Sequence, residues 1–179
     1  MKKLILALPL LFSNLLHAES LQVELEKVED GDTLVVNLKG QSERIQLLGI
    51  DAPEDTQNPK LKVDAARSGI DINTLKLLGQ EATNELKKSI DPGDPLQLKG
   101  NIQQRDRYGR ITAEVFSENN ISLNVQMVER GFAKPLKPDS LPQALRDQVL
   151  SAWTQAEAEQ RGLFSSQTEI FHAWLKVQK

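Results

Sequence analysis

The sequence predicts an α+β domain in which five short strands form a small barrel and about three helices pack on its outside. Two observations carry this prediction. Segments with alternating apolar and polar residues fall into two groups, at 20–50 and 96–117, and Gly-, Asp- or Pro-containing turns separate their members. Segments with apolar residues at helical spacing follow each group.

The first group of strands predicts an antiparallel meander. SLQVELEKV at 20–28 places apolar residues on one face and polar residues on the other. TLVVNL at 33–38 and ERIQLLGI at 43–50 follow as the second and third strands. The turns between them, EDGD and KGQS, are short, so consecutive strands are expected to pair.

The middle of the chain predicts a helix between the two groups of strands. Residues 55–72 are polar with scattered apolar positions, which indicates a long surface excursion. Leucines and other apolar residues at helical spacing then predict a helix over 73–90, with Asn73 as its N-cap and DPGDP ending it. Strands four and five follow at 96–103 and 110–117.

The C-terminal third predicts two more helices, at 121–130 and 140–161, joined by the Pro-containing link KPLKPD. Five short strands in this order suit a small closed barrel of the OB type, and the alternative is a flat sheet covered by helices on one side. We place the domain at 19–165. Residues 166–179, which contain IFHAWLKV, form a C-terminal amphipathic tail.

The N-terminus predicts export. MKKLILALPLLFSNLLHA has two lysines, an uncharged apolar run and a small residue at Ala18, the pattern of a secretory signal cleaved near that alanine. A buried N-terminal helix is the alternative. The run is too short for a stable membrane span, and no other segment is long and apolar enough. We expect a monomer that is periplasmic or secreted and has no membrane span.

Composition narrows the chemistry that this chain supports. Loss of residues 1–18 removes Lys2 and Lys3 and leaves 20 basic and 25 acidic residues, a net charge of −5. The chain has no cysteine, and removal of His17 with the signal leaves His172 as the single histidine. Cysteine nucleophiles, thiolate metal sites and enzymes that need two histidines are therefore excluded. Carboxylates, arginines and hard metal ions remain.

Two acidic turns border strands that are predicted to be neighbours. Asp30 and Asp32 lie in EDGDT, whereas Asp51 and Glu54 lie in DAPE. Hard divalent cations prefer several oxygen ligands, so two carboxylates from adjacent strands and a backbone carbonyl would form a metal site. The alternative is that Asp, Gly and Pro are here only because they favour turns.

The segment QRDRYGR adds basic and aromatic groups. Arg105, Arg107 and Arg110 offer phosphate-binding guanidinium groups, and Tyr108 offers a ring on which a base stacks. A solvated hairpin is the alternative for this segment alone. Together with the acidic turns, however, it supplies the groups needed to hydrolyse a phosphodiester without histidine.

Read together, EDGDT, LLGIDAPE and RDRYGR resemble the staphylococcal nuclease (thermonuclease) family in order and separation. LNVQMVERGFAK and AEAEQRGLF extend the similarity, which covers roughly residues 21–165. The resemblance implies an OB-fold barrel with three helices. It also implies Ca²⁺-dependent cleavage of DNA and RNA that leaves 3′-phosphate ends.

The resemblance also implies roles for individual residues. Asp32 and Asp51 match the calcium-ligating aspartates, and Ala52 lies where the family supplies a backbone carbonyl. Glu54 matches the glutamate that acts as general base or orients the attacking water. Arg110 matches one of two catalytic arginines.

The resemblance also implies that RDRYGR contains residues that bind the nucleotide. Tyr108 matches the tyrosine that contacts the nucleotide near the scissile phosphate, and Arg107 and Arg105 are expected to bind the substrate. The tyrosines that the family usually has after GFAK are absent from PLKPDS, and residues 55–72 exceed the family's usual loop.

The second catalytic arginine of the family is missing from its expected position. Five residues before Asp51 stands Gln46, and an arginine occurs two residues earlier, at Arg44. Positions two apart share a face of a strand, so Arg44 could serve as a stand-in, directly or through a bulge. Loss of one such donor lowers the rate by about 10² to 10³. The alternatives to a nuclease are a catalytically impaired module that binds nucleic acid or a protein partner, and a structural envelope protein.

Overall fold

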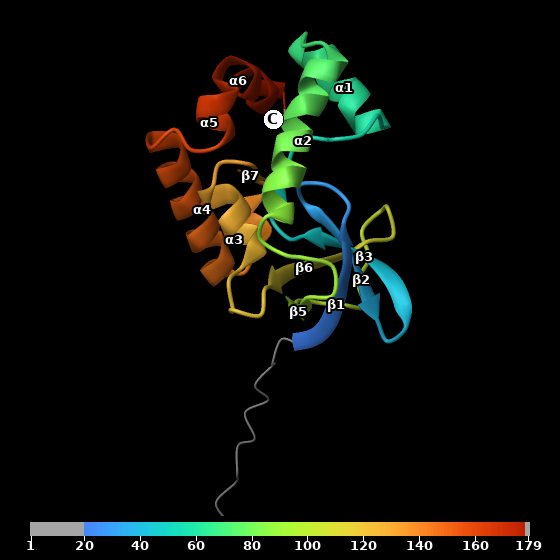
Figure 1. Cartoon of the computed structure of the whole chain (residues 1–179). Coiled ribbons are helices and arrows are strands. Elements are labelled where there is room, and N and C mark those ends of the chain that lie inside the picture. Colours follow the sequence, from blue (N-terminus) through green and yellow to red (C-terminus); the bar gives the residue numbers. More distant parts are fainter. Residues whose placement is uncertain (1–19, 178–179) are drawn as a thin grey trace, which may run out of the picture.

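A closed five-stranded barrel forms the centre of the computed structural model, which describes residues 20–177 (Figure 1). Around the barrel the strands follow in the order β1 (Ser20–Val28), β2 (Thr33–Leu38), β3 (Gln41–Leu47), β6 (Ile111–Phe116) and β5 (Pro95–Lys99). Only β3 and β6 pair in parallel, and β1 closes the barrel by pairing with both β2 and β5. The predicted α+β barrel is confirmed, and the flat-sheet alternative is wrong.

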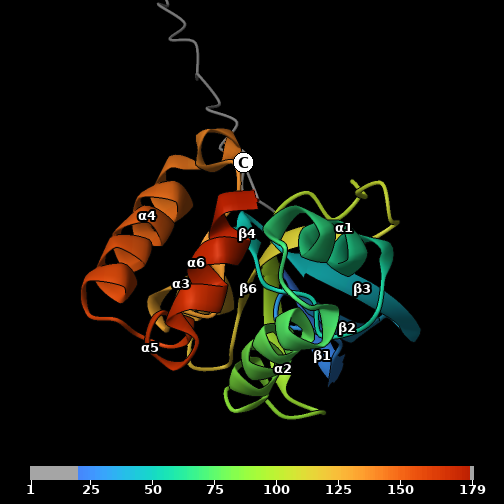
Figure 2. The same cartoon turned by 90° about the horizontal axis from the view of Figure 1, so that it is seen from above.

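Helices pack against one side of this barrel, above and to the left of the strands in Figure 1 (Figures 1 and 2). They are α1 (Pro59–Ser68), α2 (Ile72–Lys87), α3 (Leu123–Glu129), α4 (Gln143–Ala158), α5 (Leu163–Ser166) and α6 (Thr168–Val177). Two short strands, β4 (Ile50–Asp51) and β7 (Lys134–Pro135), pair beside the barrel, and a 3₁₀ turn spans Pro138–Ser140. None of the described helices is long and apolar enough to cross a membrane. The predicted signal peptide lies outside the described residues.

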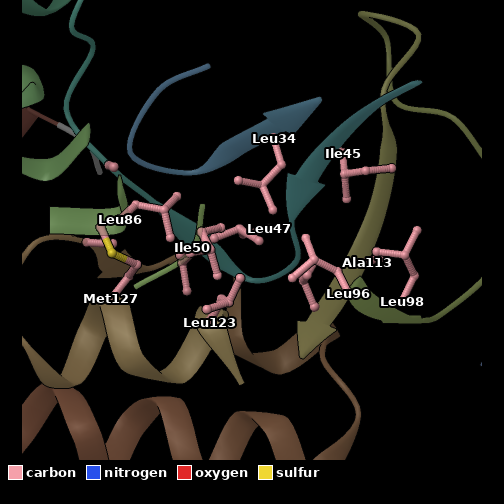
Figure 3. Close-up of a cluster of buried hydrophobic side chains, with 14 of the residues drawn as sticks. Leu34, Ile45, Leu47, Ile50, Leu86, Leu96, Leu98, Ala113, Leu123 and Met127 are labelled. Atoms are coloured by element: carbon pink, nitrogen blue, oxygen red, sulfur yellow. The ribbon is translucent and has the colours of Figure 1, made fainter. Parts of the chain in front are cut away.

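The barrel core follows from the alternation of the strands, with one irregularity. In β1, Val23 and Leu25 are buried, and a bulge between Leu25 and Lys27 shifts the register so that Val28 is the next inward residue. Figure 3 shows how side chains of the strands meet those of the helices beneath them, where Leu123 and Met127 of α3 complete the core.

The predicted surface excursion at 55–72 is wrong in its middle, because residues 59–68 form helix α1. The Asn58 side chain caps this helix by accepting a hydrogen bond from the Leu61 N–H at 2.8 Å, and Pro59 begins it. Since α1 fully buries only two of its own residues, its sequence carries little apolar periodicity. Helix α2 is capped by Asp71, not by Asn73 as predicted.

A second apolar cluster, here called the helical cluster, joins α1 and α2 to the C-terminal segment. Its buried members are Leu61, Leu75, Leu78, Ala156, Leu163, Phe164, Phe171 and Trp174. Phe171 makes an edge contact with Phe164 at a centroid distance of 5.0 Å and stacks on Trp174 at 5.6 Å. The segment predicted as an amphipathic tail therefore docks its apolar face against α1 and α2.

Substitution of Trp174 is expected to destabilise the protein strongly. Trp174 is 1% exposed, so Trp174→Ala would leave a large cavity in the helical cluster and lower the free energy of unfolding by about 3 to 5 kcal/mol. Chemical denaturation measures this change. Leu77→Ala is the control, because Leu77 lies on α2 but is 55% exposed, and it should change stability little. Equal effects of the two substitutions would contradict docking of α6.

Candidate active site

The two acidic turns lie against each other at one end of β2 and β3. The Asp32 carboxylate accepts a hydrogen bond from the Ala52 N–H at 2.8 Å, and the Asp32 carbonyl accepts one from Leu47 at 2.8 Å. Both Asp32 and Asp51 are 8% exposed. The structure thus brings together the two turns that the sequence places 20 residues apart.

Helix α2 presses small residues against both turns. A Cβ on Gly79 would lie 2.2 Å from the backbone carbon and oxygen of Glu54, so only glycine permits this approach. Gly31, between Asp30 and Asp32, faces Ala82 of the same helix, which a Cβ would approach to 2.8 Å. The positions of the two turns are therefore set by the packing of α2.

Burial and mutual repulsion change the protonation of the acids. Burial, with the nearby charge of Asp30, raises the pKa of Asp32 to about 7 although the Ala52 N–H opposes the shift. Burial also raises the pKa of Asp51 to about 6, against the opposing charges of Lys60 and Lys134. The pKa of Asp30 is raised as well, mainly by burial. This cluster holds more negative charge than its surroundings favour.

Two lysines that sequence reasoning missed supply positive charge to the cluster. The Lys60 Nζ lies 3.1 Å from Glu54 Oε1 and 3.3 Å from Asp51 Oδ1, and the Lys134 Nζ lies 3.7 Å from Asp51 Oδ2. Burial disfavours the charged form of Lys60, but the adjacent carboxylates outweigh it and raise its pKa. Burial lowers the pKa of Lys134, with Asp51 opposing. In the sequence, GFAK, which contains Lys134, indicates only similarity to the family.

Arg110 reaches the acidic cluster through Thr33. Its Nη1 donates to Thr33 Oγ1 at 3.2 Å, and the Thr33 hydroxyl lies 3.1 Å from Asp32 Oδ1. Its Nε donates to Asp106 Oδ2 at 2.8 Å, which fixes the guanidinium group. Thr33 is fully buried. It was also missed, although it is the last residue of the EDGDT motif.

The other predicted substrate-binding residues lie on the surface of the same hairpin. Tyr108 is 58% exposed, and its ring centroid lies 4.7 Å from the Arg107 Cζ and 5.2 Å from the Arg110 Cζ. Arg105 instead makes a bidentate ion pair with Glu43, with both distances 2.7 Å. Tyr108 and Arg107 are therefore accessible to a ligand, whereas Arg105 is engaged with β3.

Gln46 and Arg44 point along the same face of β3 but reach different neighbours. Gln46 pairs with Thr33 across the strands, and its Oε1 lies 3.3 Å from the Thr33 hydroxyl. Arg44 pairs with Glu29 at the surface through Nε and Nη2. The register shows no bulge in β3 that would turn Arg44 toward the acids. In the structure, Gln46 occupies the position beside Arg110 and Thr33, and Arg44 does not.

Asn58 orients Glu54 as well as capping α1. Its Nδ2 donates a short hydrogen bond to Glu54 Oε2, while its Oδ1 accepts from the Leu61 N–H. The other Glu54 oxygen faces the Lys60 ammonium. The candidate base is therefore held on one side by the helix cap and on the other by a lysine of the same helix. Sequence reasoning missed Asn58 because it treated this segment as a loop.

Comparison with known proteins identifies the family. The model of the staphylococcal nuclease homologue family matches residues 44–166, which include Asp51, Glu54 and Arg110. The chain belongs to the staphylococcal nuclease family. The match begins within β3, so Asp32 lies outside it.

Some of the proteins to which this chain is similar are nucleases by name. The chain is 32% identical over 111 residues to endonuclease YhcR of Bacillus subtilis, a match that covers 60% of this chain and 8% of that protein. It is 29% identical over 150 residues to an uncharacterized protein of Bacillus anthracis, covering 82% of this chain and 62% of the relative. It is 28% identical over 138 residues to the thermonuclease of Staphylococcus intermedius, covering 77% and 71%. The chain thus spans less than two thirds of the first two relatives.

The site chemistry fits a hard divalent cation. The carboxylates of Asp32 and Asp51 and the carbonyl of Ala52 are oxygen donors, and the two carboxylates are buried in a cluster of excess negative charge. Within residues 20–177, no three acidic or imidazole side chains are arranged so that they would hold a metal ion by themselves. A cation here would therefore depend on backbone carbonyl and water oxygens in addition to the two aspartates.

The raised pKa of Asp32 predicts that, in the absence of divalent cations, the folded protein becomes less stable as the pH rises. A carboxyl whose pKa is higher in the folded than in the unfolded protein loses stabilising protonation as pH rises from about 4 to about 7. Asp32→Asn should therefore raise the melting temperature at pH 8 in EGTA, and much less at pH 4. Asp139→Asn, at an exposed aspartate, should have no such effect. Equal melting temperatures for wild type and Asp32→Asn at pH 8 would contradict the prediction.

Proposed function

We propose that this chain is an exported, Ca²⁺-dependent nuclease that hydrolyses phosphodiester bonds of DNA, RNA or both and leaves 3′-phosphate ends. One observation carries the proposal. A continuous set of contacts runs from Arg110 through Thr33 to Asp32, and from the neighbouring Asp51 through Lys60 to Glu54. One cluster thus contains a guanidinium group suited to bind phosphate (Arg110), two carboxylates suited to bind a metal ion (Asp32 and Asp51) and a carboxylate suited to act as a base (Glu54).

The residues of this cluster suit an in-line hydrolysis. Bound at Asp32, Asp51 and the Ala52 carbonyl, Ca²⁺ would supply positive charge for a non-bridging phosphate oxygen. Glu54 takes a proton from a water whose oxygen forms the new bond to phosphorus. The bond between phosphorus and the 5′-oxygen breaks, and this oxygen leaves as a hydroxyl after taking a proton from solvent. Arg110 donates hydrogen bonds to the phosphate oxygens as their negative charge increases.

The substrate class and the location rest on further support. The relatives named above include a thermonuclease and an endonuclease, and the exposed Tyr108 beside Arg107 offers a surface for stacking a base. Export is supported by the lysines, the apolar run and the small residue at Ala18.

A catalytically impaired binding module is the second candidate function. The structure favours it at one point, because Gln46 rather than an arginine stands beside Thr33, and Arg44 is paired with Glu29. Such a module would bind nucleic acid or a protein partner through the same surface. It would bind equally well with or without the Glu54 carboxylate.

Substitution of the candidate base separates the two functions. Glu54→Gln should lower the rate of cleavage of single-stranded DNA in Ca²⁺ by about 10² to 10⁴, since the amide cannot accept the proton from water. Wild type in EGTA should be inactive. Glu157→Gln, at an exposed glutamate of α4, is the control and should retain full activity. Absence of cleavage by wild type at high enzyme concentration, with Ca²⁺ bound, would rule out the nuclease.

Restoring the missing arginine should increase activity. Gln46→Arg would place a guanidinium group beside Thr33 and Arg110, and kcat should rise by up to about 10² to 10³. Arg44→Gln should change kcat far less than Gln46→Arg, because Arg44 pairs with Glu29 and reaches Asp30 and Asp106 only through charge. A large loss of kcat in Arg44→Gln would instead show that Arg44 reaches the substrate.

A further inference from the structure

The ammonium of Lys60 lies where three carboxylates meet. Its Nζ is 3.1 Å from Glu54 Oε1, 3.3 Å from Asp51 Oδ1 and 3.5 Å from Asp64 Oδ2. The side chain is 34% exposed along its length, but the nitrogen itself is buried. Two of these acids belong to the proposed catalytic cluster, whereas Asp64 belongs to α1, one turn after Lys60.

The Lys60 ammonium is shared among the three carboxylates and is not fixed to one of them. Its Nζ lies within ion-pair distance of all three, and its contacts with Glu54 and Asp51 combine charge with hydrogen bonding. Arg110 differs, since its guanidinium group is fixed by directed hydrogen bonds to Asp106 and Thr33. The lysine ammonium is a compact charge on a flexible four-carbon stem, so it can change partners more easily than a guanidinium group that two directed bonds fix.

Asp64 provides an alternative partner for Lys60 outside the cluster. It is 4% exposed and stands four residues after Lys60 on the same helix. Its Oδ2 also accepts a hydrogen bond from the indole Nε1 of Trp174 at 3.3 Å, so its position is fixed by α6. The Trp174 ring lies 5.8 Å from the Lys60 Nζ, which adds a cation–π attraction on this side.

We infer that Lys60 is a built-in counter-ion that competes with the divalent cation for Asp51 while it also neutralises Glu54. When the cation binds, the ammonium moves to Asp64 and the Trp174 ring, so it remains paired in both states. The Lys134 Nζ, 3.7 Å from the other Asp51 oxygen, Oδ2, opposes the cation in the same sense. Lys60 therefore sets the affinity of the site. This inference rests on the proposed function for the place of the cation.

Removal of Lys60 should strengthen Ca²⁺ binding. A unit charge beside the metal-ligating carboxylates repels a divalent ion strongly at this distance, so Lys60→Met should lower the Kd for Ca²⁺ by at least about tenfold. Isothermal titration calorimetry of the purified protein with CaCl₂ measures the Kd. Lys62→Met is the matched control, because it removes the same charge from an exposed position of the same helix, and its Kd should stay at the wild-type value.

A double-mutant cycle tests the role of Asp64. Asp64→Asn keeps an acceptor for Trp174 but removes the second partner of Lys60, so it should raise the Kd for Ca²⁺. In the Lys60→Met background, the same substitution should change the Kd far less, because the Lys60 ammonium that Asp64 would receive is then absent. Equal effects in both backgrounds would show that Asp64 acts only through its own charge, and would overturn the inference.

The outcomes also separate this inference from the nuclease proposal. Equal Kd values for Ca²⁺ in Lys60→Met and Lys62→Met would overturn the inference that Lys60 competes with the cation, whatever the activity of the enzyme. If Lys60→Met does not fold, a Kd for Ca²⁺ in Asp64→Asn that equals the wild-type value would overturn the same inference. Ca²⁺ binding that tightens in Lys60→Met, together with an absence of cleavage by the wild-type protein, would support the inference and exclude the nuclease.

Discussion

The contact between helix α2 and the two acidic turns is the constraint on which the site depends. Gly79 allows the helix to touch the backbone of Glu54, and Ala82 fills the space beside Gly31. Thr83, one turn along, donates to the Asp55 carboxylate at 2.7 Å, which fixes the end of the second turn. Because this packing acts on backbone, it holds the carboxylates together against their mutual repulsion.

Electrostatic crowding follows directly from that packing. Burial raises the pKa values of Asp32 and Asp51 into the range of about 6 to 7, so their ionised forms are disfavoured near neutral pH. Ammonium groups from α1 and β7 offset part of the repulsion among the carboxylates. The same crowding of carboxylates would favour the divalent cation that we propose to bind here.

The helical cluster connects the far end of the chain to this chemistry. Trp174 of α6 packs against α1 and hydrogen-bonds Asp64, which in turn lies beside Lys60. Asn58 at the start of α1 holds the other side of Glu54. Helix α1 therefore contacts the candidate base through two residues, and α6 supports α1. Helices α1 and α6, which are not part of the five-stranded barrel, therefore position side chains next to the acidic cluster.

The sequence by itself determined the barrel and the acidic turns of the candidate site. Alternation in the strands is a local property, and the motifs EDGDT and DAPE border strands that are expected to be neighbours. The resemblance of these motifs and RDRYGR to the staphylococcal nuclease family then implies roles for Asp32, Asp51 and Arg110. The sequence could not reveal α1, because that helix buries only two of its own residues and signals its presence mainly through its caps.

Only the tertiary structure decided which groups complete the site. Thr33 connects Arg110 to Asp32 across 77 residues, and Trp174 reaches Asp64 across 110 residues. Lys60 reads in the sequence as an ordinary surface lysine, and it becomes a counter-ion only because α2 and α6 press α1 against the acidic turns. Local sequence patterns determine helices and strands, whereas the charged groups that lie beside a buried carboxylate depend on the packing of segments that are distant in the chain.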